Sequence, residues 1–106
     1  MRIESSKSAL PTGSWTELRC EASGDGPLTL HWKKADRIIE SDQRVQVVST
    51  VSPGDERRHL LHLNISHVVI QDGGWYFCEA ANAFGSDAAQ FQLIVQGMNW
   101  ISPQHL

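Results

Sequence analysis

Apolar and polar residues alternate with a period of two along most of this chain. Successive side chains of a β-strand point to opposite faces, so the alternation predicts short strands that each bury one face. The residues expected to share an inward face are Thr16, Leu18, Cys20 and Ala22; Leu28, Leu30 and Trp32; Val45 and Val47; Leu61, Leu63 and Ile65; Tyr76, Cys78 and Ala80; and Phe91, Leu93 and Val95. A helical period is not evident in any segment, so we expect an all-β sandwich.

Glycine, proline and aspartate cluster between these runs and predict turns, as in the Asp-Gly-Gly sequence at 72–74. The predicted strands cover 15–22, 28–34, 37–39, 44–49, 58–65, 74–82 and 87–96, with further strand structure within 3–11. One short helical turn is expected at 68–71. Residues 1–96 are thus predicted to form a single domain, and residues 97–106 a linker or tail.

The length, charge and composition of the chain argue against several classes of function. A chain of 106 residues supports one hydrophobic core. Its net charge of −3 argues against a nucleic-acid partner, and it has no apolar run long enough to insert into a membrane. The five histidines lack metal-ligand spacing, and no catalytic sequence motif is present. We therefore expect a protein that is not an enzyme and that uses neither metal nor cofactor.

Specific motifs add a family resemblance. Trp32 lies between Cys20 and Cys78, and Tyr76 lies two residues before the second cysteine. The run from Leu63 to Cys78 has the form L-x-I-x-x-V-x-x-x-D-x-G-x-Y-x-C, and Cys-Glu-Ala-Ala-Asn-Ala-Phe-Gly follows at 78–85. Over nearly its whole length the chain resembles an intermediate-set (I-set) immunoglobulin domain, which implies a two-sheet Greek-key sandwich. Residues 80–87 are most similar to adhesion molecules of the Down-syndrome cell adhesion molecule group.

The resemblance also implies roles for particular residues. Cys20 and Cys78 would form a disulfide between the sheets, and Trp32 would pack beside it. Tyr76 would enter the core and donate its hydroxyl proton to backbone near Asp72. Arg44 and Asp72 would form an ion pair at the bottom of the sandwich; the alternative is that they are two unrelated surface charges.

The resemblance favours a non-catalytic recognition module in an extracellular adhesion molecule or receptor, with another protein as partner. An identical domain is one candidate partner. The two cysteines favour an oxidising compartment. Residues 1–4 do not read as a signal peptide, so we expect a fragment of a longer secreted protein. The alternative is an intracellular structural domain of the titin type, in which the cysteines would stay reduced.

Large aromatic residues mark a candidate interface. Because Tyr76 and Cys78 are expected to face inward, Trp75 and Phe77 must face outward. We expect Ile94 nearby, Lys33 within cation–π reach, and His31 close to the same face; such aromatic side chains favour protein interfaces. The open alternative is that this face is covered by the next domain or by Met98, Trp100 and Ile101 of the tail.

A second candidate site is the N-glycosylation sequon Asn64-Ile65-Ser66. Leu63 and Ile65 are expected to face inward, so Asn64 should face solvent. A glycan there would keep partners off the sheet that contains it. The alternative is a chance occurrence of a common triplet.

Overall fold

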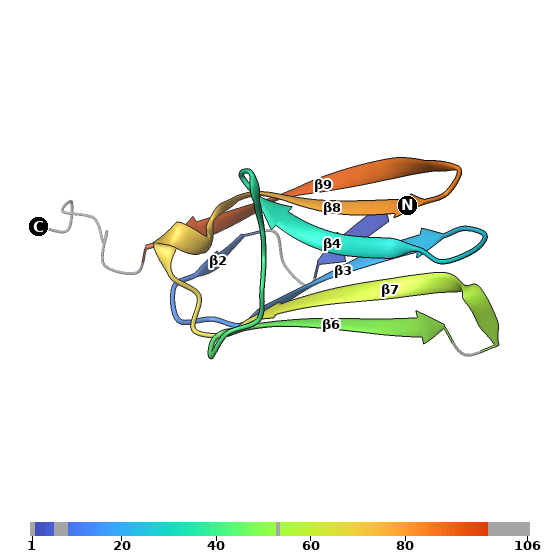
Figure 1. Ribbon diagram of the computed structural model, residues 1–106. Helices are drawn as coiled ribbons and strands as arrows, with labels where there is room; N and C mark the ends of the chain where they lie inside the picture. Colours follow the sequence, from blue (N-terminus) through green and yellow to red (C-terminus); the bar gives the residue numbers. More distant parts are fainter. Residues whose placement is uncertain (1, 6–8, 53, 98–106) are drawn as a thin grey trace, which may run out of the picture.

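Two sheets pack face to face in the computed structural model, which describes residues 2–5, 9–52 and 54–97 (Figure 1). The four-stranded sheet has the order β1 (Arg2–Ser5), β3 (Thr16–Ser23), β7 (Asp55–Ile65), β6 (Val45–Ser52). The five-stranded sheet has the order β2 (Ala9–Pro11), β9 (Gly85–Gln96), β8 (Gly74–Asn82), β4 (Thr29–Lys34), β5 (Arg37–Ile38). The strand pairs are antiparallel except β2 and β9, which are parallel. The predicted all-β, two-sheet fold is confirmed.

The strand boundaries differ from the predicted ones mainly in two places. The predicted strand region 3–11 divides, so that β1 pairs with β3 in one sheet and β2 pairs with β9 in the other. The hairpin of β6 and β7 extends to Ser52 and Asp55, because backbone pairing continues beyond the apolar alternation. A single 3₁₀ turn, Ile70–Asp72, lies two residues later than the expected helical turn. Most of the predicted tail, residues 98–106, lies outside the described residues.

The centre of the core joins the two sheets through a covalent bond. Cys20 on β3 and Cys78 on β8 form a disulfide. Trp32 lies directly opposite Cys78 in the β4–β8 register and is fully buried. Its indole N–H donates a hydrogen bond to the carbonyl oxygen of Leu61, 3.3 Å away, and Leu61 lies directly opposite Cys20 on β7. The polar atom of the buried indole is thereby paired, in a link between the sheets that lies beside the disulfide.

The remaining core side chains follow the predicted alternation, with Leu10 and Val68 added to the residues that it placed inward. The buried residues packed around the disulfide and Trp32 are Leu10, Leu18, Leu61, Leu63, Ile65, Val68, Tyr76 and Leu93. Thr16 is also fully buried, at the inward position where its strand begins. Burial of one full face of each sheet supplies the main driving force for folding.

A polar corner closes the end of the sandwich where β8 begins. Arg44 donates two hydrogen bonds to the Asp72 carboxylate, from Nη1 to Oδ2 at 2.8 Å and from Nη2 to Oδ1 at 3.1 Å. Arg44 Nη1 also lies 3.3 Å from the carbonyl oxygen of Ser66, and Asp72 Oδ2 accepts from the backbone N–H of Val69 at 2.8 Å. The hydrogen bond with Asp72 raises the pKa of Arg44 above its usual value. These contacts tie the start of β6, the end of β7 and the 3₁₀ turn together.

Tyr76 completes this corner from inside the core. Its hydroxyl donates to the carbonyl oxygen of Asp72, and Lys34 Nζ lies 5.4 Å from the centroid of its ring. Burial, together with the negative charge of Asp72, raises the pKa of Tyr76 well above its usual value of about 10. A raised pKa favours the neutral phenol, so its contribution to stability is complete below pH ~10 and is lost as the pH rises further.

This shift can be measured directly, because Tyr76 is the only tyrosine in the chain. We expect tyrosinate absorbance to develop near pH 10 in the urea-unfolded chain and only at clearly higher pH in the folded chain. The Tyr76→Phe variant should lose the absorbance change and about 1 kcal/mol of unfolding free energy, the typical net value of one hydrogen bond. A midpoint near pH 10 in the folded protein would contradict the buried, hydrogen-bonded position.

Candidate protein-binding face

The outer face of the five-stranded sheet carries the candidate interface. Tyr76 and Cys78 of β8 are buried, so Trp75 and Phe77 point away from the core. Trp75 lies opposite Gln92 of β9, and Ile94, two residues along β9, lies diagonally beside Trp75 on the same face. Trp75 is 47% exposed and Ile94 is 48% exposed. Phe77 is less open, because it is half-buried between its neighbours.

A further exposed apolar side chain lies on this face at the edge of the sheet, beyond Lys33. Phe77 lies between Gln90 of β9 and Lys33 of β4, and Lys33 lies opposite Ile38 of β5, which is 57% exposed. We call the four side chains Ile94, Trp75, Phe77 and Ile38 the apolar strip. Beside it is a shallow hollow of about 470 Å³, lined by Lys34, Ala35, Trp75, Phe77 and Gln90. Sequence reasoning missed Ile38, because a two-residue strand is too short to show alternation.

Charged groups border the apolar strip along β4 and β8. His31 Nε2 donates to Glu79 Oε1 at 2.9 Å, and Lys33 Nζ lies 3.7 Å from Glu79 Oε2. The hydrogen bond from His31, followed by the positive charge of Lys33, lowers the pKa of the Glu79 carboxyl. Lys33 lies beside Phe77, as expected, and its ammonium group pairs with the Glu79 carboxylate. A cation–π contact is described for its neighbour Lys34, with Tyr76.

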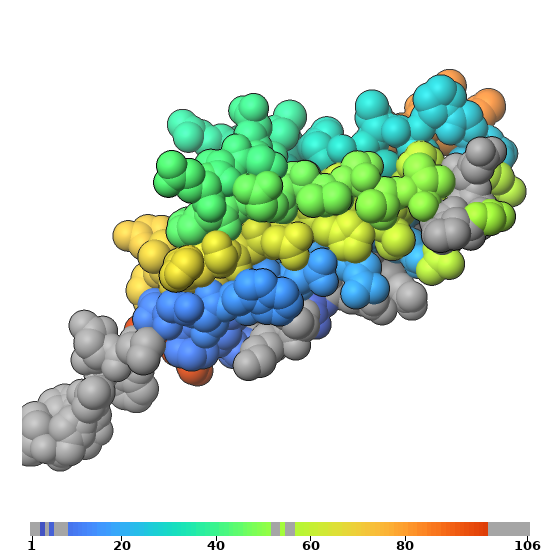
Figure 2. All heavy atoms as spheres, turned by 90° about the horizontal axis from the view of Figure 1, so that it is seen from below, coloured from blue at the N-terminus to red at the C-terminus, as the bar shows by residue number. Residues whose placement is uncertain are grey.

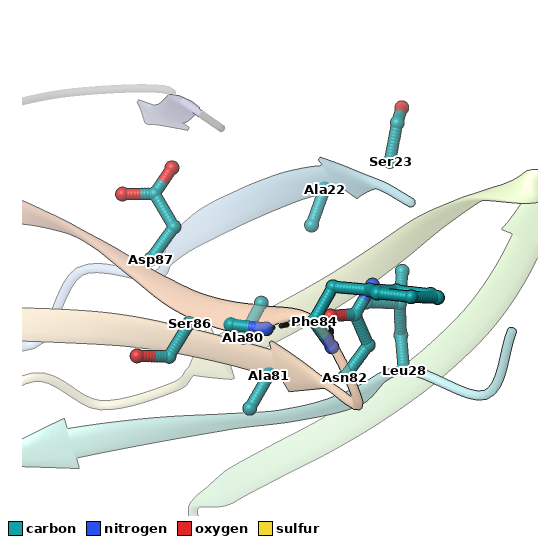
Figure 3. A pocket seen from close by; sticks show the side chains of 10 residues that line it. Ala22, Ser23, Leu28, Ala80, Ala81, Asn82, Phe84, Ser86 and Asp87 are labelled. Carbon is teal, nitrogen blue, oxygen red and sulfur yellow. Dashed lines mark hydrogen bonds between the residues drawn. The ribbon is translucent and has the colours of Figure 1, made fainter. Parts of the chain in front are cut away.

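The turn between β8 and β9 presents a further exposed aromatic side chain. Phe84 is 83% exposed at this turn. Asn82 holds the turn, since its Oδ1 accepts from the backbone N–H groups of Phe84 and Gly85 and its Nδ2 donates to the carbonyl oxygen of Asp25. Phe84 lines a hollow of about 280 Å³ together with mostly small side chains, Ala22 among them (Figure 3). The sequence contained no signal for this exposure beyond the position of Phe84 in a turn.

The outer face of the four-stranded sheet has a different character. Glu17 of β3 accepts from His62 Nδ1 of β7 at 3.2 Å, and Glu21 pairs with Arg58. Asn64 lies on this face between Glu17 and Gln46 in the strand register, and it is half-buried. Within the described residues no cluster of histidine, cysteine and carboxylate side chains could hold a metal ion. None of the helices in that part of the chain is both long and apolar enough to cross a membrane.

Comparison with known proteins identifies the class. The immunoglobulin I-set domain profile matches residues 1–95. The chain belongs to the immunoglobulin I-set family. It is 38% identical over 84 residues to cell adhesion molecule DSCAM of Gallus gallus, covering 79% of this chain and 4% of that protein. It is 33% identical over 85 residues to cell adhesion molecule DSCAML1 of Homo sapiens, again covering 79% of this chain and 4% of the relative. The predicted similarity to the Down-syndrome cell adhesion molecule group is confirmed.

Solved structures agree with this assignment. The N-terminal eight immunoglobulin domains of Down syndrome cell adhesion molecule isoform 1.30.30 contain a match with a TM-score of 0.76 and 25% identity, covering 91% of this chain and 13% of that one. A complex of Dpr2 Ig1–Ig2 with DIP-Theta Ig1–Ig3 contains a match with the same TM-score and 24% identity, covering 90% of this chain and 32% of that one. At that identity the second match shows the fold alone.

The charged border of the apolar strip generates a testable pH response. We expect the Glu79 carboxyl to titrate below the ordinary value of about 4.3, measured from its side-chain carbon resonance. Its contribution to stability is then present at neutral pH and is lost as the pH falls through the lowered pKa. His31→Gln should raise the Glu79 pKa toward the ordinary value, and Lys33→Gln should raise it less, since the hydrogen bond from His31 is the larger cause. An unchanged Glu79 titration in His31→Gln would contradict this arrangement.

Proposed function

We propose that this domain is a non-catalytic protein-recognition module of an extracellular adhesion protein, and that it binds through the apolar strip. One observation carries the proposal: Ile94, Trp75 and Ile38 are each about half exposed on a single sheet face, with Phe77 among them. Several exposed apolar side chains gathered on one face beside charged groups are typical of interaction sites. Tryptophan in particular is enriched among the residues that dominate binding energy.

We infer that the partner is an identical domain. In an isologous dimer the same patch meets itself about a two-fold axis, so the apolar strip of one copy would cover that of the other. The border carries both signs of charge, Lys33 and Glu79, so the cation of one copy can approach the anion of the other. A weak contact of this kind is sufficient at a cell surface, where repeated contacts add avidity.

The core disulfide supports an extracellular location. The disulfide between Cys20 and Cys78 belongs to proteins of oxidising compartments. The DSCAM relatives are cell adhesion molecules by name, and the chain spans only 4% of their length, so we propose that it is one domain of a longer array. The intracellular structural alternative requires both thiols to stay reduced.

The redox state of Cys20 and Cys78 distinguishes the extracellular from the intracellular location. We expect the chain, purified from its native source or from a secreting cell under non-reducing conditions, to be two hydrogens lighter than the fully reduced chain, because one disulfide has formed. Unfolding after reduction should require about 4 kcal/mol less free energy, the chain-entropy value for a loop of this length. Free thiols in protein isolated from its native source would favour the intracellular location.

The binding face is tested by removing its aromatic side chains. We expect Trp75→Ser/Phe77→Ser to weaken self-association about 30-fold in sedimentation equilibrium, since loss of an aromatic anchor removes about 2 kcal/mol or more. The matched control is Val48→Ser, which removes a 44% exposed apolar side chain from the other sheet and should leave association unchanged.

Because Phe77 is half-buried, Trp75→Ser and Ile94→Ser are also measured singly, with thermal unfolding as a check on folding. Each folded single variant should weaken association. Association that is equally strong in the wild type and in all three variants would exclude this face. A wild-type chain that stays monomeric throughout would exclude the identical-domain partner.

A further inference from the structure

The two outer faces of the sandwich are suited to different contacts. In place of an apolar strip, the four-stranded sheet presents hydrogen-bonded charges that span β3 and β7. Glu17 Oε2 lies 3.2 Å from His62 Nδ1, and Glu17 Oε1 lies 3.9 Å from Arg19 Nη2. Arg58 pairs with Glu21. Figure 2 looks onto this face, with β3 in blue, β7 in yellow-green and β6 in green lying side by side. A protein partner here would have to desolvate several ion pairs, which is unfavourable.

Asn64 lies within this polar face. It belongs to β7, an inner strand of the sheet, with Glu17 of β3 on one side and Gln46 of β6 on the other. Leu63 and Ile65 are buried, so the Asn64 side chain points away from the core. Ser66, the third residue of the sequon, follows directly after β7, and its hydroxyl donates a hydrogen bond to the Arg44 carbonyl oxygen at 3.1 Å. The sequon thus places its asparagine on the outer surface and its serine at the strand end.

We propose that Asn64 carries an N-linked glycan, which covers the outer face of the four-stranded sheet and leaves the five-stranded sheet as the face open to protein partners. This inference rests on the proposed function in one respect, entry of the chain into the secretory pathway. The donor is an oligosaccharide linked to a lipid diphosphate. Asn64 Nδ2 bonds to C1 of the first sugar and loses one proton, while the C1–O bond to the diphosphate breaks and the lipid diphosphate leaves.

The folded domain can hold such a glycan without rearrangement of its core. The attachment point lies on the strand face opposite the buried Leu63 and Ile65, so the first sugar extends toward solvent. The hydroxyl groups of a sugar can hydrogen-bond to the charged and amide side chains that flank Asn64, among them Glu17 and Gln46. The apolar strip lies on the other sheet, across the core from this attachment point.

Occupancy is tested by intact mass of the chain secreted from mammalian cells. We expect one glycan mass, removed by peptide-N-glycosidase with conversion of one asparagine to aspartate. Asn64→Gln and Ser66→Ala should both lose it, and Ser66→Thr should keep it, because threonine preserves the sequon. Ser66→Ala also loses the hydrogen bond to Arg44, so Asn64→Gln decides the outcome if that variant fails to fold. A secreted wild-type chain with the bare mass would overturn the proposal.

Coverage of one face is tested separately, by backbone amide resonances of the glycosylated and the enzymatically deglycosylated chain. We expect shift differences along β3, β6 and β7, and none along β8 and β9. Differences centred on β8 and β9 would overturn the assignment of the glycan to the four-stranded sheet. Neither measurement depends on self-association. A strictly monomeric chain with a glycan on Asn64 would therefore support glycosylation and contradict the proposal of an identical partner.

Discussion

The disulfide between Cys20 and Cys78 fixes which side of β8 faces the core. Side chains alternate along a strand, so an inward Cys78 forces Tyr76 inward and places Trp75 and Phe77 outside. A slip of β8 by one residue would exchange the two sets. The outward position of Trp75 and Phe77 therefore follows from the core, and the disulfide, Trp32 and the indole hydrogen bond to Leu61 together hold the arrangement.

The polar corner supports the same alternation from the end of the strand. The Asp72 carboxylate accepts two hydrogen bonds from Arg44, and the Asp72 carbonyl oxygen accepts a hydrogen bond from the Tyr76 hydroxyl. Gly74 then starts β8 with a φ of +131°, a conformation that favours glycine. The polar corner thus determines where β8 begins, and the disulfide determines which β8 side chains face the core. Trp75 is then the first side chain after the turn that points outward.

The alternation of apolar and polar residues predicted the longer strands, whereas segments too short or too irregular to show this alternation were missed. The bounds of β8 were predicted correctly, because Asp-Gly-Gly and Asn82 delimit a clear alternation. The ends of β6 and β7 were misjudged, since a hairpin can pair its backbone without apolar side chains. Ile38 and Phe84 were missed because short strands and turns carry no period. The partner of Lys33 depends on cross-strand register, which one sequence does not reveal.

If the domain binds its partner through the apolar strip, a glycan placed on that face should block binding. Gln90→Asn/Gln92→Ser creates an Asn-Phe-Ser sequon at a residue that lines the hollow beside Trp75 and Phe77. The measurement is the self-association constant of this secreted variant before and after enzymatic removal of the added glycan. We expect a monomer while the glycan is present and wild-type association once it is removed. Equal association in both states would show that partners bind elsewhere.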